Sequence, residues 1–323
     1  MFIEPKIPIK TLSDYVLELS DFFIDNPDEQ TPWEKVFCQQ AYRHYYLPLN
    51  AIRNHGVIQR GLQVNFFKGL THTVDWGAGP GTASLALAQI PEIQEQHLIE
   101  KSITAKKTFE DLQTHLKRPA VTTDLNLKNK NIPYHKSLLV FSYSLTEMKS
   151  LPDGWNEFEA IMILEPSTQQ DGRRLNEFRK QLIDQGYFIW APCIHQNACP
   201  LIQHSKTDWC HDRFHVKAPD WFLKLEQYLP FKNRTVTTSY LLARRTKPTK
   251  DLSQSTRLVG DSMNEKGKTR QLICRGEQRE FLTWMHKTVE AQTLPRGELI
   301  KIPADAEPKS NEIRVKTPIA TDE

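Results

Sequence analysis

No apolar run in this chain of 323 residues approaches the roughly 18 residues that a membrane-spanning helix needs. The first residues, Met1 to Pro5, lack the apolar core of a secretory signal peptide. They also lack the Arg-rich, acid-poor composition of an organelle transit peptide. These absences predict a bacterial-type chain that is located in the cytoplasm and has no membrane partner. We also expect the chain to be a monomer.

A large excess of positive charge is also missing, because 42 Lys and Arg residues face 39 Asp and Glu residues, which gives a net charge of +3. This value is far from that of a strongly basic nucleic-acid binder. The bases are unevenly spread, however, and residues 231–250 contain no acid. Their six bases are Lys232, Arg234, Arg244, Arg245, Lys247 and Lys250. This block suits either contact with a phosphate backbone or a solvated strand and loop.

The apolar pattern predicts helices at the N-terminus and then alternating strands and helices. Helices are expected over residues 12–23, from about 33 to a break at Leu47–Asn50, and from there to Gly61. Strands are expected near residues 72–76, 97–100, 119–123, 137–142, 160–164 and 186–191. Residues 236–242 alternate like an antiparallel edge strand. Residues 246–270 are polar and suggest a loop, and residues 303–323 suggest a disordered tail.

A glycine-rich segment, residues 75–82 with the sequence DWGAGPGT, separates the first expected strand from a helix. Gly77 and Gly79 permit sharp turns at which a ligand approaches main-chain N–H groups, and Gly81 permits close packing of the helix. The spacing differs from the dinucleotide fingerprint G-x-G-x-x-G. An acid-x-Gly-x-Gly-x-Gly loop is instead typical of S-adenosylmethionine methyltransferases. The position between strand and helix favours a cofactor site over an ordinary tight turn.

A second acid, Glu100, ends the next expected strand about 20 residues beyond this loop. A carboxylate at this point can accept hydrogen bonds from both ribose hydroxyls of a cofactor. The alternative is a surface residue at the start of the following helix, where a carboxylate suits the helix dipole. The distance from the glycine loop favours the ribose interpretation.

Three of the five cysteines cluster as Cys193-x5-Cys199-x10-Cys210, and Cys274 lies 64 positions beyond the last of them. Four thiolates can hold one iron–sulfur cluster or one zinc ion. The spacing does not choose between the two metals, because four histidines are close enough in sequence to serve as zinc ligands. These are His195, His204, His211 and His215. The isolated Cys38 is interpreted as a core residue.

Several segments, in order, resemble one family. They are the glycine loop, residues 98–102 (LIEKS), residues 141–147 (FSYSLTE), residues 163–168 (ILEPST), residues 191–195 (APCIH), residues 199–201 (CPL) and residues 208–211 (DWCH). Together they look like the methyltransferase-like small-ribosomal-subunit assembly proteins of mitochondria and their bacterial relatives. The resemblance extends over roughly residues 40–280, and Ile194 replaces a proline that the family often has.

The resemblance implies an α/β, Rossmann-like class I methyltransferase fold with N-terminal helices and a cysteine-bearing metal-cluster extension. It divides the chain into an N-terminal helical region (1–65), a methyltransferase domain (66–245) with a cysteine insertion (191–218), an extension that carries Cys274 (246–302) and a disordered tail (303–323). It implies S-adenosylmethionine and a [4Fe-4S] cluster, with zinc as the alternative. The implied cofactor-binding residues are Asp75, Gly77, Gly79, Pro80, Gly81, Glu100 and Ser142, and the implied cluster ligands are Cys193, Cys199, Cys210 and Cys274.

The implied partner is the small ribosomal subunit with its rRNA. Tyr143 and Glu147, after the fourth strand, are weak candidates for catalysis: the ring could stack on a base and the carboxylate could accept a proton. Glu147 equally suits a structural role. No Asn-Pro-Pro-aromatic amino-methylation motif occurs, so the methylated atom stays open. The alternatives are a non-catalytic assembly factor that keeps the pocket and a zinc-stabilised RNA-binding module.

Overall fold

A computed structural model describes residues 2–26, 29–115, 122–123, 132–148 and 150–320. The chain divides into two compact units. The first unit consists of residues 1–62, 67–165 and 214–236, and the second of residues 63–66, 166–213 and 237–323. No helix in the described part of the chain is long and apolar enough to cross a membrane.

A parallel sheet forms the centre of the first unit, in the order β3-β2-β1-β4-β5. Its strands are β1 (His72–Trp76), β2 (Glu95–Ile99), β3 (Thr122–Thr123), β4 (Ser137–Ser142) and β5 (Ala160–Glu165). Helix α4 (Thr82–Leu87) follows β1, and helix α5 (Ile103–His115) follows β2. Short 3-10 turns, η3 (Tyr134–Lys136) and η4 (Trp155–Glu157), precede β4 and β5. The predicted strands in this region are confirmed, although residues 119–121 lie outside the described residues.

Strands β4 and β5 are buried on both faces, as their uninterrupted apolar sequences predict. Parallel strands joined by helices bring all their carboxyl ends to one edge of the sheet, where α/β proteins bind ligands. In this register Asp75 of β1 pairs with Leu98 of β2 on one side and with Val140 of β4 on the other. The loops after β1, β2 and β4 therefore meet at this edge.

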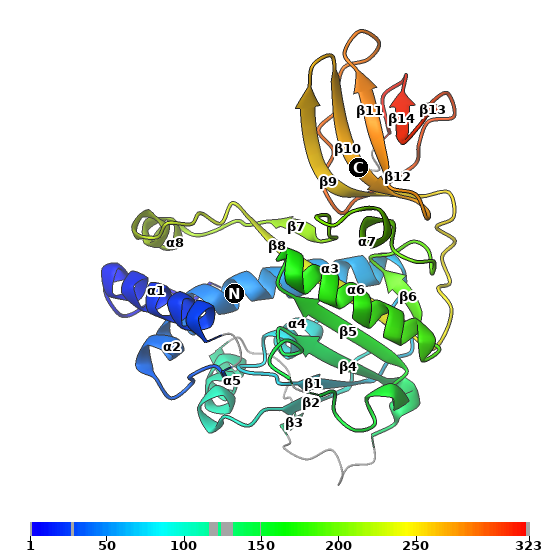
Figure 1. Cartoon of the computed structure of the whole chain (residues 1–323). Coiled ribbons are helices and arrows are strands. Elements are labelled where there is room, and N and C mark those ends of the chain that lie inside the picture. The colour runs from blue at the N-terminus through cyan, green and yellow to red at the C-terminus, as the bar shows by residue number, and fades with distance from the viewer. Residues whose placement is uncertain (1, 27–28, 116–121, 124–131, 149, 321–323) are drawn as a thin grey trace. The chain divides into compact units, whose positions relative to one another are not determined.

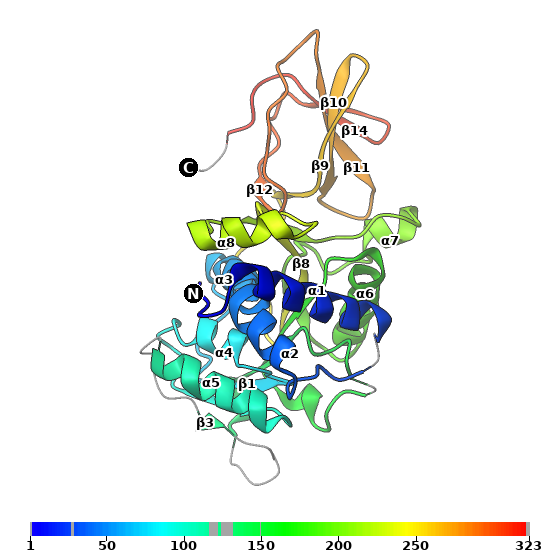
Figure 2. The same cartoon turned by 90° about the vertical axis from the view of Figure 1, so that its left-hand side faces the viewer.

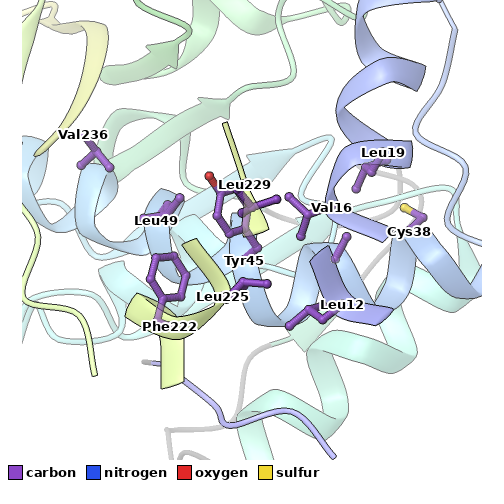
Figure 3. Close-up of a cluster of buried hydrophobic side chains, with 11 residues drawn as sticks. Leu12, Val16, Leu19, Cys38, Tyr45, Leu49, Phe222, Leu225, Leu229 and Val236 are labelled. Carbon is purple, nitrogen blue, oxygen red and sulfur yellow. The ribbon is translucent and has the colours of Figure 1, made fainter. Parts of the chain in front are cut away.

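Helices from both ends of the first unit's sequence share one apolar core. They are α1 (Ile9–Asp25), α2 (Val36–Ala41), the π-helical turn η1 (Tyr42–Tyr46), α3 (Leu47–Gln63), α8 (Asp220–Leu225) and the 3-10 turn η5 (Glu226–Tyr228). Figure 2 shows α1 beside α8, and the close-up in Figure 3 shows Leu12 and Val16 of α1 near Leu225 of α8. Cys38 is fully buried in this core, as predicted.

The expected helix break at residues 47–50 is wrong. The backbone continues from α2 through η1 into α3 without interruption, and Pro48 is the second residue of α3. Proline lacks an N–H group and breaks a helix when an interior hydrogen bond needs that group. A π-helical turn shifts the hydrogen-bond pattern by one residue, which lets a proline follow it inside a continuous helix.

In the second unit, helix α6 (Gln169–Asp184) precedes β6 (Phe188–Ala191), and helix α7 (Pro200–His204) follows it. Strand β8 (Thr235–Arg244) pairs with β6 in antiparallel direction and also with β7 (Asp212–His215). The expected edge position of residues 236–242 is therefore wrong. Even the polar side chains of Thr238 and Ser239 in this strand are buried.

The rest of the second unit is a six-stranded sheet, coloured orange to red in Figure 1, in the order β12-β9-β10-β11-β14-β13. Its strands are β9 (Thr256–Glu265), β10 (Lys268–Cys274), β11 (Glu280–Met285), β12 (Leu299–Ile300), β13 (Glu307–Lys309) and β14 (Glu312–Val315). β9, β10 and β11 form an antiparallel meander, and β14 joins β11 in parallel.

Two expectations about this region need correction. The polar segment 246–270 contains the whole ten-residue strand β9 and the start of β10, not only a loop. Only the first half of β9 is buried, and residues 261–264 are exposed; three of these four, Asp261, Ser262 and Asn264, are polar. The expected disordered tail contains β13 and β14, and Ile313, Val315 and Ile319 are buried in the core of the sheet.

Candidate cofactor site and cysteine cluster

The glycine loop turns sharply between β1 and α4. Gly77, Gly79 and Gly81 all have positive φ angles, of 68°, 53° and 71°, a region that residues with a Cβ rarely adopt. A Cβ on Gly81 would lie 2.3 Å from the ring of Phe109 in α5. Pro80 is buried beside it. The strand, loop and helix predicted from residues 72–90 are therefore present.

Two carboxylates flank this loop. Glu100, after β2, accepts hydrogen bonds from the Gly79 N–H (2.7 Å, Oε2) and from the Ser102 N–H (2.8 Å, Oε1). It thus contacts the glycine loop and also the turn that leads into α5. The ribose-binding role of Glu100 stays a prediction.

Asp75 is almost completely buried, with 1% of its surface exposed. Its Oδ2 accepts hydrogen bonds from the Ser84 N–H (3.2 Å) and hydroxyl (2.8 Å), whereas Oδ1 has no hydrogen-bond partner among the described residues. Burial raises the pKa of Asp75 to about 6, an effect that the two bonds from Ser84 oppose. Asp75 Oδ1 is therefore a buried acceptor that no hydrogen bond from the described residues satisfies.

The loop after β4 contacts the glycine loop directly. The Ser144 hydroxyl donates to the Trp76 carbonyl (2.6 Å), and a Cβ on Gly77 would lie 2.7 Å from the Ser144 Cβ. Tyr143 has a φ angle of +61°, which is unusual for a residue with a bulky side chain. The Ser142 hydroxyl accepts a bond from Asn54 Nδ2 (3.1 Å). Three predicted residues, Ser142, Tyr143 and Gly77, are thus gathered at this edge of the sheet.

Glu147 lies further along the same loop and is held by the N-terminal region. Its Oε1 accepts a hydrogen bond from the Thr31 hydroxyl (3.3 Å), and burial raises its pKa to about 6. A second buried acid, Glu165 at the end of β5, accepts a bond from the Leu145 N–H (3.1 Å). Sequence reasoning missed Glu165 because it read β5 only as an apolar strand.

Sequence reasoning also missed Trp33. A Cβ on Gly79 would lie 3.2 Å from the Trp33 ring, whose centroid is 4.7 Å from that of Tyr42. The Trp33 carbonyl accepts a bond from Gln39 Nε2 (3.0 Å), which ties this residue to α2. Trp33 therefore lies against the glycine loop, together with the neighbouring Thr31 that holds Glu147. The concentration of aromatic residues between positions 33 and 46 was the sequence feature that could have indicated this contact.

The four predicted cysteine ligands all belong to the second unit. Cys199 and Cys210 pack against a buried apolar cluster that contains Cys274, Leu201, Val259, Leu272 and Phe281. The Cys274 Sγ lies 3.5 Å from His195 Nε2. Cys193 Sγ accepts a hydrogen bond from Arg179 Nε (3.3 Å), and the same guanidinium donates to the His195 carbonyl (2.9 Å).

Burial raises the pKa of Cys210 to about 12 and also raises the pKa values of Cys199 and Cys274. Proximity of the other cysteines raises the pKa of each of these thiols further. These thiols are thus neutral at pH 7 unless a cation stabilises the thiolates. Among the described residues, no three His, Cys, Asp or Glu side chains are arranged to hold a metal ion. The four thiols therefore suit a metal in chemistry, but the side chains do not form a finished coordination shell.

The basic block at residues 231–250 is only partly available to a partner. Arg244 is buried, donates to the Phe66 carbonyl (2.9 Å) and lies over the Trp190 ring. Arg245 lies over the Tyr187 ring and donates to the Gln185 carbonyl (2.7 Å). Lys247 and Lys250 are exposed. The interpretation of the whole block as a phosphate-contacting surface is therefore wrong for Arg244.

The sequence matches the family model described as mitochondrial small ribosomal subunit Rsm22 over residues 63–291, which is more than half of the chain. The chain belongs to the Rsm22 family. This membership confirms the family resemblance. The part that matches the Rsm22 model contains the glycine loop, Glu100 and all four clustered cysteines, and it ends before β12.

Solved structures similar to this Rsm22 family member include several methyltransferases. They are magnesium protoporphyrin IX methyltransferase from Synechocystis PCC 6803 (14% identity, 74% of this chain and 100% of that chain, TM-score 0.35), an rRNA methylase from Streptococcus thermophilus (9%, 58% and 93%, 0.34) and TrmK from M. capricolum (11%, 58% and 69%, 0.32). A search of curated proteins found no match.

Proposed function

We propose that this protein binds S-adenosylmethionine at the glycine loop and acts as a methyltransferase on the rRNA or a protein of the small ribosomal subunit, in assembly or translation. The observation that carries the proposal is the pair of carboxylates at the carboxyl edge of the parallel sheet. Asp75 keeps one buried oxygen without a hydrogen-bond partner among the described residues, and Glu100 bonds to the glycine loop itself. Family membership supports the small ribosomal subunit as the partner.

In this proposal Glu100 accepts hydrogen bonds from the two ribose hydroxyls. The positive-φ glycines present main-chain N–H groups without a Cβ in the way. Trp33 lies against Gly79 and would cover the bound cofactor from the N-terminal side. The cofactor supplies an activated methyl group, and the protein's main contribution is alignment of the acceptor atom.

The residues beside the reacting group are those of the β4 loop. Tyr143 has an uncommon, positive φ angle. Such backbone strain is often found at functional sites, where the surrounding structure holds the residue in place. Glu147, with a pKa of about 6, is ionised at pH 7 and can accept a proton from the acceptor atom. We assign these two residues to acceptor positioning and proton removal.

A non-catalytic assembly factor is the second candidate. The Thr31 hydroxyl already bonds to Glu147, and Trp33 already lies on the glycine loop, so the N-terminal segment occupies the edge at which an acceptor would enter. Transfer of a tritiated methyl group to immature small subunits separates the two functions. Turnover that is lost in Glu147→Gln supports the enzyme, and tight subunit binding without turnover supports the assembly factor.

The cofactor assignment predicts that Gly79→Val prevents S-adenosylmethionine binding. A branched side chain would collide with Trp33 and is strained at a φ angle of +53°. Glu100→Gln should weaken binding about tenfold, because an amide is a poorer acceptor for two hydroxyls than a carboxylate. Isothermal calorimetry measures both, with Gly267→Val, at an open turn of the second unit, as the control. Unchanged affinity in Gly79→Val would contradict the site.

We further propose that Cys193, Cys199, Cys210 and Cys274 bind a [4Fe-4S] cluster after a rearrangement of their side chains. Iron–sulfur clusters are held by four thiolates, whereas zinc also accepts imidazole. The Arg179 guanidinium donates a hydrogen bond to Cys193 Sγ. Its positive charge would stabilise the negative charge of a thiolate-bound cluster. Zinc held by three cysteines and His195 is the alternative, because His195 contacts Cys274.

The cluster assignment predicts a brown preparation, purified without oxygen, that contains iron and sulfide and is bleached by air. Cys274→Ser should lose the iron and lower the unfolding temperature, since metal binding stabilises the folded state. Cys38→Ser, in the core of the first unit, should keep the iron. Metal analysis and the visible spectrum test this. A colourless protein with one zinc ion that depends on His195 would instead support the zinc site.

We also propose that the protein is a monomer in the cytoplasm. Light scattering of the purified protein tests the first statement, and imaging of a tagged chain tests the second.

A further inference from the structure

A cavity lies wholly within the second unit, and none of its lining residues belongs to the glycine loop. Its volume is about 250 Å³. Trp209, Phe281 and Met263 contribute to its walls, and Met263 of β9 is 40% exposed, so water reaches the cavity. Pockets for drug-sized molecules usually measure about 300–1,000 Å³. This cavity therefore suits a smaller group, such as one heterocyclic ring system.

The carboxylates that line the cavity are all paired with arginines, and Asp261 also accepts two hydrogen bonds from Arg213 outside the lining (2.7 and 2.9 Å). Two arginines and two aspartates line it: Arg279 donates to Asp208 (2.6 Å), and Arg296 lies 3.7 Å from Asp261. An anion such as phosphate would have to compete with these carboxylates. A neutral ligand that carries both hydrogen-bond donors and acceptors would match guanidinium N–H groups and carboxylate oxygens together.

Three planar side chains, Trp209, His211 and Phe281, share the remaining wall with aliphatic residues. The Arg279 guanidinium lies 4.8 Å from the centroid of the Phe281 ring, and the Trp209 ring is fixed by a bond from Nε1 to the Ser167 carbonyl (2.7 Å). The Trp209 ring is also 5.6 Å from that of His211, whose buried Nδ1 has no hydrogen-bond partner among the described residues. Aromatic rings held in place by such contacts are the surfaces on which unpaired bases stack.

We propose that this cavity binds one unstacked base of single-stranded RNA. A nucleobase is planar, neutral and small, and its edge carries both donors and acceptors. The RNA class rests on the proposed function, since family membership points to the small ribosomal subunit. The base-binding property itself rests only on the cavity, so the two can be tested separately.

The test uses the full chain with saturating S-adenosylmethionine, which blocks adenosine from the glycine loop. Saturation-transfer NMR with the four ribonucleosides measures binding to the wild type and to two variants. Met263→Trp would fill the cavity from its exposed side. Ser262→Trp is the matched control, because Ser262 is the preceding residue of the same strand, is exposed and does not line the cavity. Unchanged unfolding temperatures establish that both variants are folded.

The expected result is a signal from at least one nucleoside in the wild type and in Ser262→Trp, and its loss in Met263→Trp. Affinity for purified small-subunit rRNA should then fall about tenfold in Met263→Trp, the size of effect typical for one stacked base. Equal nucleoside signals in all three proteins, or none in any, would overturn the proposal. A saturation-transfer signal from N-acetyltryptophanamide, with none from any nucleoside, would overturn the proposal and assign the cavity to a protein side chain instead. Nucleoside binding without rRNA binding would leave the cavity assignment intact and remove the proposed ribosomal function.

Discussion

Replacing Gly81 by alanine should destabilise the protein by about 2–5 kcal/mol and abolish cofactor binding. The left-handed backbone conformation at φ +71° costs a residue with a Cβ about 1–2 kcal/mol. The new methyl group would also lie 2.3 Å from the Phe109 ring and 3.0 Å from Leu98. Both neighbours are buried, so neither can move away freely, and overpacking of this kind costs about 1–3 kcal/mol.

Gly69→Ala is the matched control for this prediction. Gly69 also has a positive φ, of 80°, but no atom lies within 4 Å of the position of a Cβ. The control should therefore show only the backbone cost. Urea unfolding gives the two changes in the free energy of unfolding, and calorimetry gives cofactor affinity. Equal destabilisation by the two substitutions would show that α5 does not pack on the glycine loop as described.

Reversing the charge of Arg244 should be still more damaging, with an expected loss of about 3–5 kcal/mol. In Arg244→Glu a buried carboxylate would face the Phe66 carbonyl, to which the guanidinium now donates, and would no longer stack on the Trp190 ring. An RNA-binding assay on this variant would mainly report unfolding. Thermal unfolding followed by circular dichroism is the appropriate measurement.

The double variant Lys247→Glu/Lys250→Glu separates RNA binding from stability. Both side chains are exposed and belong to the same basic block. We expect an unchanged unfolding temperature, together with weaker rRNA binding and a salt dependence whose slope falls by about one unit for each phosphate that the protein no longer neutralises. An unchanged slope would mean that the block is a solvated surface.

For the Arg244→Glu variant, normal stability would contradict the buried position of that side chain.

The sequence was sufficient for the parallel sheet because its strands are marked by local chemistry. Residues 138–141 and 161–164 are short continuous apolar runs, which are typical of strands buried on both faces of a sheet. Pro48 misled the prediction, since a local rule for proline does not include the hydrogen-bond shift of a π-helical turn. Strand β9 was missed because its exposed half is polar and its pairing partner, β10, is needed to recognise it.

The candidate site divides in the same way. Glycine spacing and the acid at the end of β2 identified the loop and Glu100, because both are close together in sequence or fixed by strand order. The contact of Trp33 with Gly79 joins residues 46 positions apart through side-chain packing alone, which no pattern of spacing encodes. Cys274 was placed with the other cysteines by family resemblance, and its position in their apolar cluster follows from the strand β10 that the sequence did not reveal.

The parallel pairing of β11 with β14 has a consequence for the order in which the chain can fold during synthesis. β14, near the end of the chain, lies between β11 and β13 inside the sheet. Until residues 312–315 leave the ribosome, one edge of β11 has no partner strand, and exposed strand edges promote aggregation. A chain truncated at residue 291, where the family match ends, would keep that open edge permanently. Expression work on this protein should therefore retain β13 and β14, even though they lie outside the matched region.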